Sequence, residues 1–448
     1  MTNKPEKHDT HHKALSINLD GTIFGSFAEI GAGQEVARWF LRVGGASGTV
    51  AKTISAYDKE VSDDLYGAGT RYVSKPRLEA MLDNEWAQLL SQLHATRGVT
   101  ARFFAFVDTI SARNFAGTND CHGWMGLRFL RQPGGEPSQI LLHANLRDST
   151  NLRQQEAVGI LGVNLIYATH HAVSSPTEFL ASLFEDLHLQ RLEIDCVELS
   201  GPAFAGWDPR LLRAQLVAGG HAEAVAFPVD GLSVPANELL YKRALVLAPG
   251  RFDNVAQMHG ELIRWTLADL PEAEVKESKG GLGLFCLSTA PGLREEASVT
   301  SEEIVRQVVE LQALGYGVMV FRAPELYTMS AFVNRYTKSR IHFAIGLTVL
   351  VKVLEDNYNN LAGSLMEGIA RLFSQNVRLS VYPMKAEAVE QRIKAAGLTG
   401  WRWQTTEGMV HADGLYPDAP LGHLYQYLLS SGFILAGKPT RNEAAAAS

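Results

Sequence analysis

A glycine-rich run at residues 27–58 contains the residue types that cradle a phosphate group or a nucleotide. Glycine allows positive φ and close backbone approach, and backbone N–H groups at a helix N-terminus bind anions. The run completes no motif: GAGQEV has Val36 where G-x-G-x-x-G requires its last glycine, and GGASGTVAKT lacks Gly-Lys-Thr. Two tight turns that pack a helix against a sheet explain the same glycines. If the run holds a ligand, the expected contacts are Gly31, Gly33, Glu35, Arg38, Gly45, Gly48, Lys52 and Thr53.

Three further residues are the candidates for catalysis. His122 follows Cys121, but neighbouring side chains on a strand point to opposite faces, so His122 alone is the better general acid–base. A loop histidine beside a buried cysteine is the structural alternative. Asp108 ends an apolar strand and Arg113 follows it, where they either project into a site or form a salt bridge. We expect Glu35, Arg38, Lys52, Asp108, Arg113 and His122 to converge in one cleft.

Other acidic and histidine residues give no metal site. His170 and His171 are neighbours on a predicted helix and diverge by ~100°. The chain contains no H-E-x-x-H and no C-x-x-C spacing. Glu193 and Asp195 are two residues apart on a predicted strand and therefore share one of its faces. Two such carboxylates either bind a metal or a sugar or face solvent, and we prefer the solvent interpretation. The sequence identifies no cofactor.

Composition narrows the class of protein. The chain has 448 residues, of which 46% are hydrophobic, and a net charge of -7. This acidic balance argues against nucleic-acid binding, which needs a basic surface. The three cysteines are far apart in the sequence and odd in number, which indicates a protein of a reducing compartment without a disulfide framework. The sequence has no run of ~18 apolar residues for a membrane span and no signal peptide at its start, so we predict a cytoplasmic protein.

The elements that position these residues divide into two lobes. Early strands at 101–110, 124–130 and 139–145, with the turn QPGGEPS, predict a mixed or antiparallel sheet. Strands and helices alternate after residue 281, which predicts a mainly parallel sheet flanked by helices. We therefore predict an α/β fold with a disordered tail at 1–13, a first lobe at 14–270 that opens on a strand at 14–20, a linker at 270–281, a second lobe at 282–434 and a tail at 435–448.

Several stretches together resemble an uncharacterised bacterial cytosolic family. They are residues 24–38 and 43–58, GTNDCHGWMGLRF, PSQILLH, NLRQQEAVGILGVNLIYA and GPAFAGWDPRL. Members are often labelled TonB-dependent receptors or nicotinate-nucleotide adenylyltransferases. The residues support neither label, because a receptor needs a signal peptide and about twenty-two strands and the transferase needs His-x-Gly-His.

The resemblance covers residues 15–432 and is more specific in the first half. It implies a common fold and no established activity. In the second half the family has LPGGILEAFGRLF where this chain has LAGSLMEGIARLF at 361–373, so one glycine of a pair is replaced. Any ligand contact of that loop is altered here.

Two functions of different classes follow. The first is binding of a phosphorylated or nucleotide-like small molecule by the first lobe, with or without an enzyme reaction. The second is a non-enzymatic protein that assembles into a homo-oligomer or filament. Trp401 and Trp403 share one face of an extended segment, so they lie at such an interface or close over the core of the second lobe.

Overall fold

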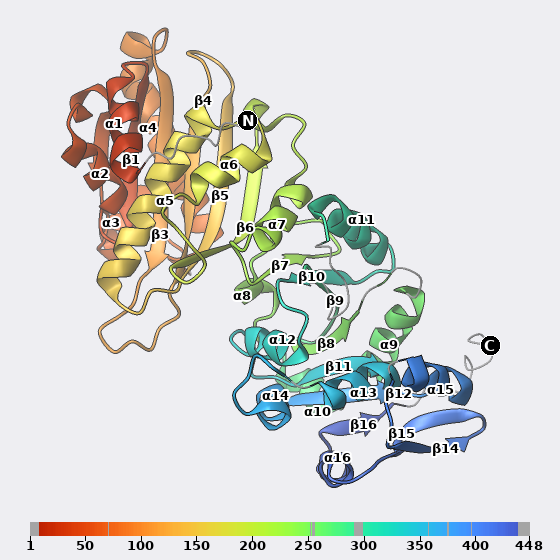
Figure 1. Cartoon of the computed structure of the whole chain (residues 1–448). Helices are drawn as coiled ribbons and strands as arrows, with labels where there is room; N and C mark the ends of the chain where they lie inside the picture. The colour runs from red at the N-terminus through yellow and green to blue at the C-terminus, as the bar shows by residue number, and fades with distance from the viewer. Residues whose placement is uncertain are drawn as a thin grey trace. The chain divides into compact units, whose positions relative to one another are not determined.

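The computed structural model describes residues 9–69, 71–250, 252, 256–290, 299–356, 358–373, 376–395 and 397–437. The chain forms two compact units, Met1–Val225 and Ala226–Ser448. Each unit combines helices with a central sheet, which confirms the predicted α/β class (Figure 1). Residues 438–448 of the predicted tail at 435–448 and residues 1–8 of the N-terminal tail lie outside the described residues, whereas residues 435 and 436 of the predicted tail belong to strand β16, which spans Ile434–Ala436.

The first unit is built on a six-stranded mixed sheet in the order β2-β1-β3-β4-β5-β6. The three strands β2, β1 and β3 run parallel, and β4, β5 and β6 continue the sheet antiparallel. The bounds are β1 Ile23–Ile30, β2 Val50–Ile54, β3 Arg102–Ser111, β4 His122–Leu130, β5 Pro137–Leu146 and β6 Leu192–Ser200. The carboxyl ends of the parallel strands therefore meet the start of β4 at one edge, which we call the carboxyl edge.

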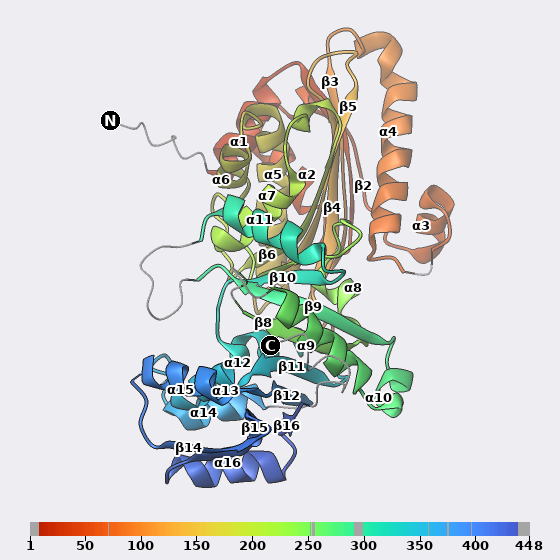
Figure 2. The same ribbon diagram turned by 90° about the vertical axis from the view of Figure 1, so that its right-hand side faces the viewer.

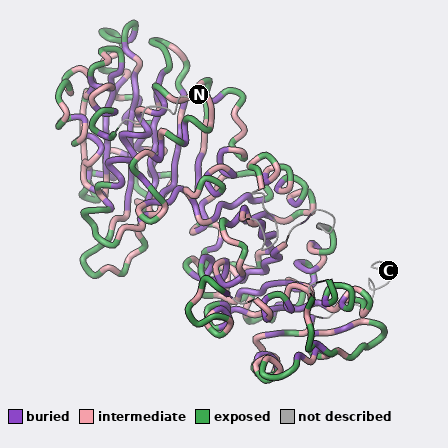
Figure 3. Tube along the Cα trace, viewed as in Figure 1, coloured by how far each residue is buried: buried purple, intermediate pink, exposed green. Residues whose placement is uncertain are grey.

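Helices cover both faces of this sheet (Figure 2). Helix α4 packs on one face against Val107 and Trp124, while α1, α2 and α5 lie on the other with Phe27 and Phe106. Apart from β2, the strands between these layers are buried along most of their length (Figure 3). The helices of this unit are α1 Thr10–Leu19, α2 Glu35–Val43, α3 Lys59–Tyr66, α4 Lys75–Arg97, α5 Asn151–His171, α6 Pro176–Leu183 and α7 Pro209–Ala218, with short 3-10 turns at Ala46–Gly48 and Pro202–Phe204.

The start of the described chain is a helix where the sequence predicts a tail and then a strand. Asp9 caps α1 by accepting a hydrogen bond from the backbone N–H of His12. Lys13 is fully buried, and its Nζ donates to Asn164 Oδ1 at 2.9 Å and lies 2.7 Å from Glu185 Oε2. The alternating pattern of residues 14–20 was misleading because this contact with α5, invisible in the local sequence, holds the segment as a helix.

The second unit contains a seven-stranded sheet in the order β16-β12-β11-β8-β9-β10-β7. Every described pairing from β16 across to β10 is parallel, in agreement with the predicted mainly parallel sheet. The bounds are β7 Ala224–Phe227, β8 Ala244–Pro249, β9 Gly281–Ser288, β10 Gly317–Phe321, β11 Ile341–Gly346, β12 Val377–Tyr382 and β16 Ile434–Ala436. A small antiparallel sheet adds β13 Met384–Lys385, β14 Trp401–Thr406 and β15 Met409–Pro417.

The helices of the second unit alternate with its strands. They are α8 Ala236–Leu239, α9 Ala256–Ala268, α10 Glu272–Glu277, α11 Ser301–Gln312, α12 Leu326–Val333, α13 Leu347–Glu355, α14 Ser364–Leu372, α15 Ala386–Ala395 and α16 Leu421–Ser430. In the described part of the chain, no helix is both long and apolar enough to cross a membrane.

The boundary between the units falls inside β7, at Val225, and not at the predicted linker 270–281. Those residues form α10 and the approach to β9 within the second unit. The reason is β8, which pairs in parallel with both β9 and β11 and so belongs at the centre of the second sheet. A charged, glycine-containing stretch marks a surface connection, and such connections also occur inside a domain.

Candidate functional site

A chain of three side chains crosses the α4 face of the first sheet at its carboxyl edge. His122 Nδ1 lies 3.0 Å from His143 Nε2, and His143 Nδ1 lies 2.6 Å from Asp195 Oδ1. His122 begins β4, His143 lies on β5, and Asp195 lies on β6. The register shifts between β5 and β6 beside His143, which places Asp195 within reach of the ring. We call His122, His143 and Asp195 the relay.

The hydrogen bonds assign the protons of the relay. A carboxylate on Asp195 accepts from Nδ1–H of His143, so the other nitrogen of that ring, Nε2, is an acceptor. His122 must then donate its Nδ1–H to His143, which makes Nε2 of His122 the unprotonated nitrogen. The relay is thus polarised from Asp195 outward to His122.

The two ends of the relay differ in how far they are buried. His143 and Asp195 are 0% and 2% exposed, and the indole of Trp124 packs against the His143 ring, whereas His122 is half-buried. The pKa of His122 is lowered to about 4, first by desolvation and then by His143 and Arg71, against the attraction of Asp120 and Asp195. His122 is therefore neutral at pH 7 and carries a lone pair.

Two exposed arginines lie on chain segments next to the outer end of the relay. Arg71 is close enough to lower the pKa of His122 electrostatically. Arg113 follows Ser111 by two residues, and Ser111 pairs directly with His122 across the β3–β4 ladder. The backbone of Arg113 is fixed, since its N–H donates to Gln154 Oε1 at 2.7 Å and its carbonyl accepts from Asn151. Among the described residues neither arginine forms an ion pair, and Asp108 and Arg113 do not pair with each other.

The opposite face holds two buried carboxyl groups. Glu29 and Asp108 are cross-strand neighbours on β1 and β3, each 1% exposed. Glu29 accepts hydrogen bonds of 2.9 Å from the backbone N–H groups of Val36 and Ala37 in the first turn of α2. Burial raises the pKa of Glu29 to about 7 and that of Asp108 well above its usual range. The N–H groups of α2 that would face a phosphate therefore already bind an internal carboxyl group.

The glycines of the run have packing roles in this structure. A Cβ on Gly31 would approach the backbone oxygen of Ile110 to 1.8 Å, so glycine allows β1 to end against β3. Gly45 has φ 75° in the turn that follows α2, and Gly48 lies against Asn18 of α1. Gly33 also has positive φ. These observations fit the tight-turn alternative, and a ligand role for the four glycines stays a prediction.

The charged and polar residues of the run are mostly paired inside the unit. Lys52 lies 2.7 Å from Glu85, a carboxylate of α4 that is 1% exposed and also accepts from Tyr66. Thr53 accepts from Gln34, and Arg38 pairs with Glu35 on the surface of α2.

The predicted residues do not form one cleft. Lys52 and His122 lie on the α4 face, whereas Asp108 is on the other face with α2, which carries Glu35 and Arg38, so the sheet separates them. Two relay members, His143 and Asp195, were missed as a site, and the preferred solvent exposure of Glu193 and Asp195 is wrong because both are buried. The available signal was that His122 lies just ahead of one predicted strand, and that His143 and Asp195 lie within the next two.

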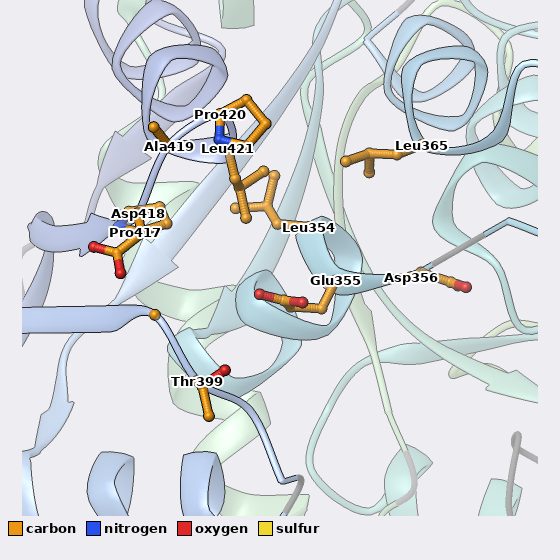
Figure 4. Close-up of a pocket in the computed structure, with 11 residues that line it drawn as sticks. Leu354, Glu355, Asp356, Leu365, Thr399, Pro417, Asp418, Ala419, Pro420 and Leu421 are labelled. Carbon is orange, nitrogen blue, oxygen red and sulfur yellow. The ribbon is translucent and has the colours of Figure 1, made fainter.

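The second unit contains a cavity of about 320 Å³ beside the small sheet (Figure 4). Three carboxylates, Glu355, Asp356 and Asp418, line it together with Leu354, Leu365 and Pro420. Glu355 accepts from the indole N–H of Trp401, and Asp418 pairs with the exposed Arg402. Acidic walls repel a phosphate, so this cavity does not suit the ligand predicted from the sequence.

Comparisons with known proteins supply no family. No family model matches the chain, and no curated protein matches it. Solved structures of the competence/damage-inducible protein CihA from Agrobacterium tumefaciens and a CinA superfamily protein from Enterobacter cloacae are similar to part of it. The first has 20% identity, a TM-score of 0.26, and covers 38% of this chain and 98% of its own. The second has 13% identity, a TM-score of 0.21, and covers 31% and 83%. At TM-scores this low, the similarity supports no inference about function. Within the described residues, no group of three or more potential metal ligands occurs.

Proposed function

We propose that the first unit binds a small phosphorylated or nucleotide-like molecule at its carboxyl edge, on the α4 face. One observation carries the proposal: Arg71 and Arg113 are both exposed and without a carboxylate partner among the described residues, and Arg71 acts electrostatically on His122 while Arg113 follows the end of β3 that pairs with His122. Arginine is the side chain best suited to bidentate contact with a phosphate. The edge formed by carboxyl ends of parallel strands is also where α/β sheets commonly bind ligands.

The relay supports the same location. A neutral His122 adds a polar group near Arg71, while His143 and Asp195 keep its orientation fixed. The glycine run is a weaker location, because Glu29 occupies the N–H groups of Val36 and Ala37. We therefore expect the ligand at Arg71 and Arg113, and we expect the glycine-rich run to support the fold of the unit.

A thermal-shift panel tests this proposal. Wild-type protein is melted with AMP, ribose 5-phosphate and inorganic phosphate, and with adenosine and ribose as uncharged partners. Phosphorylated compounds should raise the melting temperature and the uncharged ones should not. Arg71→Gln and Arg113→Gln should each weaken binding by about 10- to 100-fold, as expected for a lost charge-assisted contact.

Arg38→Gln is the matched control, since Arg38 is an exposed arginine on the other face and already pairs with Glu35. It should bind as the wild type does. Stabilisation by none of the phosphorylated compounds, or equal loss in all three variants, would contradict the proposed location.

Self-assembly remains the second candidate, favoured by one observation. Phe115, in the loop between β3 and β4, is completely exposed, and Leu152 at the start of α5 is 75% exposed. Large exposed apolar side chains are enriched at interfaces. Trp401 does not contribute, since it is buried against Tyr425 and donates to Glu355, in line with the core alternative. Light scattering of wild type and Phe115→Ser tests this candidate: a smaller particle for the variant is expected, and a monomeric wild type contradicts it.

A further inference from the structure

We propose that Asp195 and His143 act as positioning residues that hold His122 as the proton-accepting group of the site, with Nε2 facing a hydroxyl group of the bound molecule or of water. This inference rests on the proposed function and goes beyond it, because it assigns acid–base chemistry to a location that otherwise only binds. It needs no metal, oxidant or further reactant.

The geometry that carries the inference is the continuity of the two hydrogen bonds. They run 2.6 Å and 3.0 Å from a buried carboxylate through a fully buried ring to a half-buried ring. A buried aspartate and histidine joined in this way cost desolvation energy, which a purely apolar packing of β4, β5 and β6 would avoid. The two hydrogen bonds run from the protein interior toward the carboxyl edge, so the charge of Asp195 polarises the His122 ring at that edge.

The proton transfer balances within the relay. An O–H bond of the hydroxyl group breaks, its electron pair stays on oxygen, and a new N–H bond forms at Nε2 of His122. The Nδ1–H of His122 then moves toward Nε2 of His143, and the Nδ1–H of His143 moves toward Asp195. The positive charge is thereby drawn away from Arg71 and toward the buried carboxylate. Arg71 in turn pairs with the anionic group of the ligand under the proposed function.

The tautomers of the imidazole rings provide the test. Proton–nitrogen correlation spectra of the ¹⁵N-labelled full chain at pH 7, without ligand, should show His122 protonated at Nδ1 and unprotonated at Nε2. In His143→Phe, which keeps an aromatic ring beside Trp124, His122 loses its acceptor, so the Nδ1–H form should fall from nearly all molecules to a minority. His221→Phe is the control, because His221 stacks on Phe184 outside the relay and should leave the His122 signals unchanged.

Asp195→Asn is the second variant, with the shape of aspartate and no charge. His122 should bind a proton roughly tenfold more weakly in this variant, as followed by the pH titration of its ring signals. If His143→Phe fails to fold, this titration decides alone. A wild-type His122 protonated at Nε2, or an unchanged titration in Asp195→Asn, would overturn the inference. The thermal-shift panel tests the ligand separately, so loss of ligand binding alone would remove the proposed function and leave the tautomer assignment intact.

Discussion

The two faces of the first sheet bury ionisable groups in different ways. On the α2 face, Glu29 and Asp108 are neighbours, no described cation contributes to their pKa shifts, and burial raises the pKa of both. On the α4 face, Asp195 accepts a hydrogen bond from His143 and Glu85 pairs with Lys52, so each of these two acids has a basic side chain as its partner. The difference indicates that the carboxyl groups on the α2 face hold helix α2 in place. On the α4 face, the relay instead places the polarised His122 ring at the carboxyl edge. Predictions that separate these roles follow in order of expected effect.

Removing the Glu29 carboxyl group should have the largest effect on stability. Glu29→Ala leaves the N–H groups of Val36 and Ala37 without their acceptor inside the protein and opens a cavity, which should lower the free energy of unfolding by about 3 kcal/mol. Urea denaturation measures the change. Glu35→Ala on the same helix, where the carboxylate is partly exposed, is the control and should cost less than about 1 kcal/mol. Equal losses in both variants would contradict a helix-holding role for Glu29.

Lys52→Met should be the next most damaging change. It removes the cation beside Glu85, a carboxylate that is 1% exposed, while Tyr66 remains as its donor. Because Lys52 itself is partly exposed, we expect a loss of about 2 kcal/mol, below the usual range for a fully buried pair. Restored stability in Lys52→Met/Glu85→Leu would confirm the coupling. A stable single variant that loses AMP binding would instead favour the ligand role predicted from the sequence.

A buried histidine without a partner gives a prediction for pH. His170 is 6% exposed between Phe104 and Phe129, and neither ring nitrogen has a hydrogen-bond partner among the residues that the structure describes. Desolvation, followed by Arg102, lowers its pKa from 6.5 to about 3. A lowered histidine pKa means that the unfolded chain binds the proton first, so stability falls as pH drops below 6.5 and continues to fall until about 3. At pH 5 the loss is about 2 kcal/mol.

The variant His170→Leu should remove this part of the acid sensitivity. Melting curves between pH 7 and pH 4 should show a smaller decrease for His170→Leu than for the wild type. His188→Leu, at a histidine of the same unit that lies outside this aromatic cluster, should retain the wild-type slope. Parallel curves for wild type and His170→Leu would show that His170 does not control the acid response.

The sequence predicted the sheets better than the site. Strands with alternating or continuous apolar residues, such as 101–110, were placed correctly because their pattern reflects burial on the sheet. The relay was missed because His143 and Asp195 are far apart in the sequence, and only strand pairing with a shifted register joins them. The helical state of residues 14–19 depends on the distant contact of Lys13 with Asn164. The sequence pattern indicated Gly31, Gly45 and Gly48 as candidate ligand contacts. Close packing of backbones and tight turns also require glycine, so the residue type alone does not distinguish these roles.

The most direct test of the central claim is the response of the His122 ring to a phosphorylated ligand. Proton–nitrogen spectra of the wild-type chain are recorded during titration with AMP. A site at the α4 face predicts that the His122 ring signals shift with AMP, while those of His170 and His221 stay in place and Arg71→Gln abolishes the shift. Unmoved His122 signals together with shifted amide signals of Gly31 and Gly33 would place the ligand at the glycine run and contradict the account.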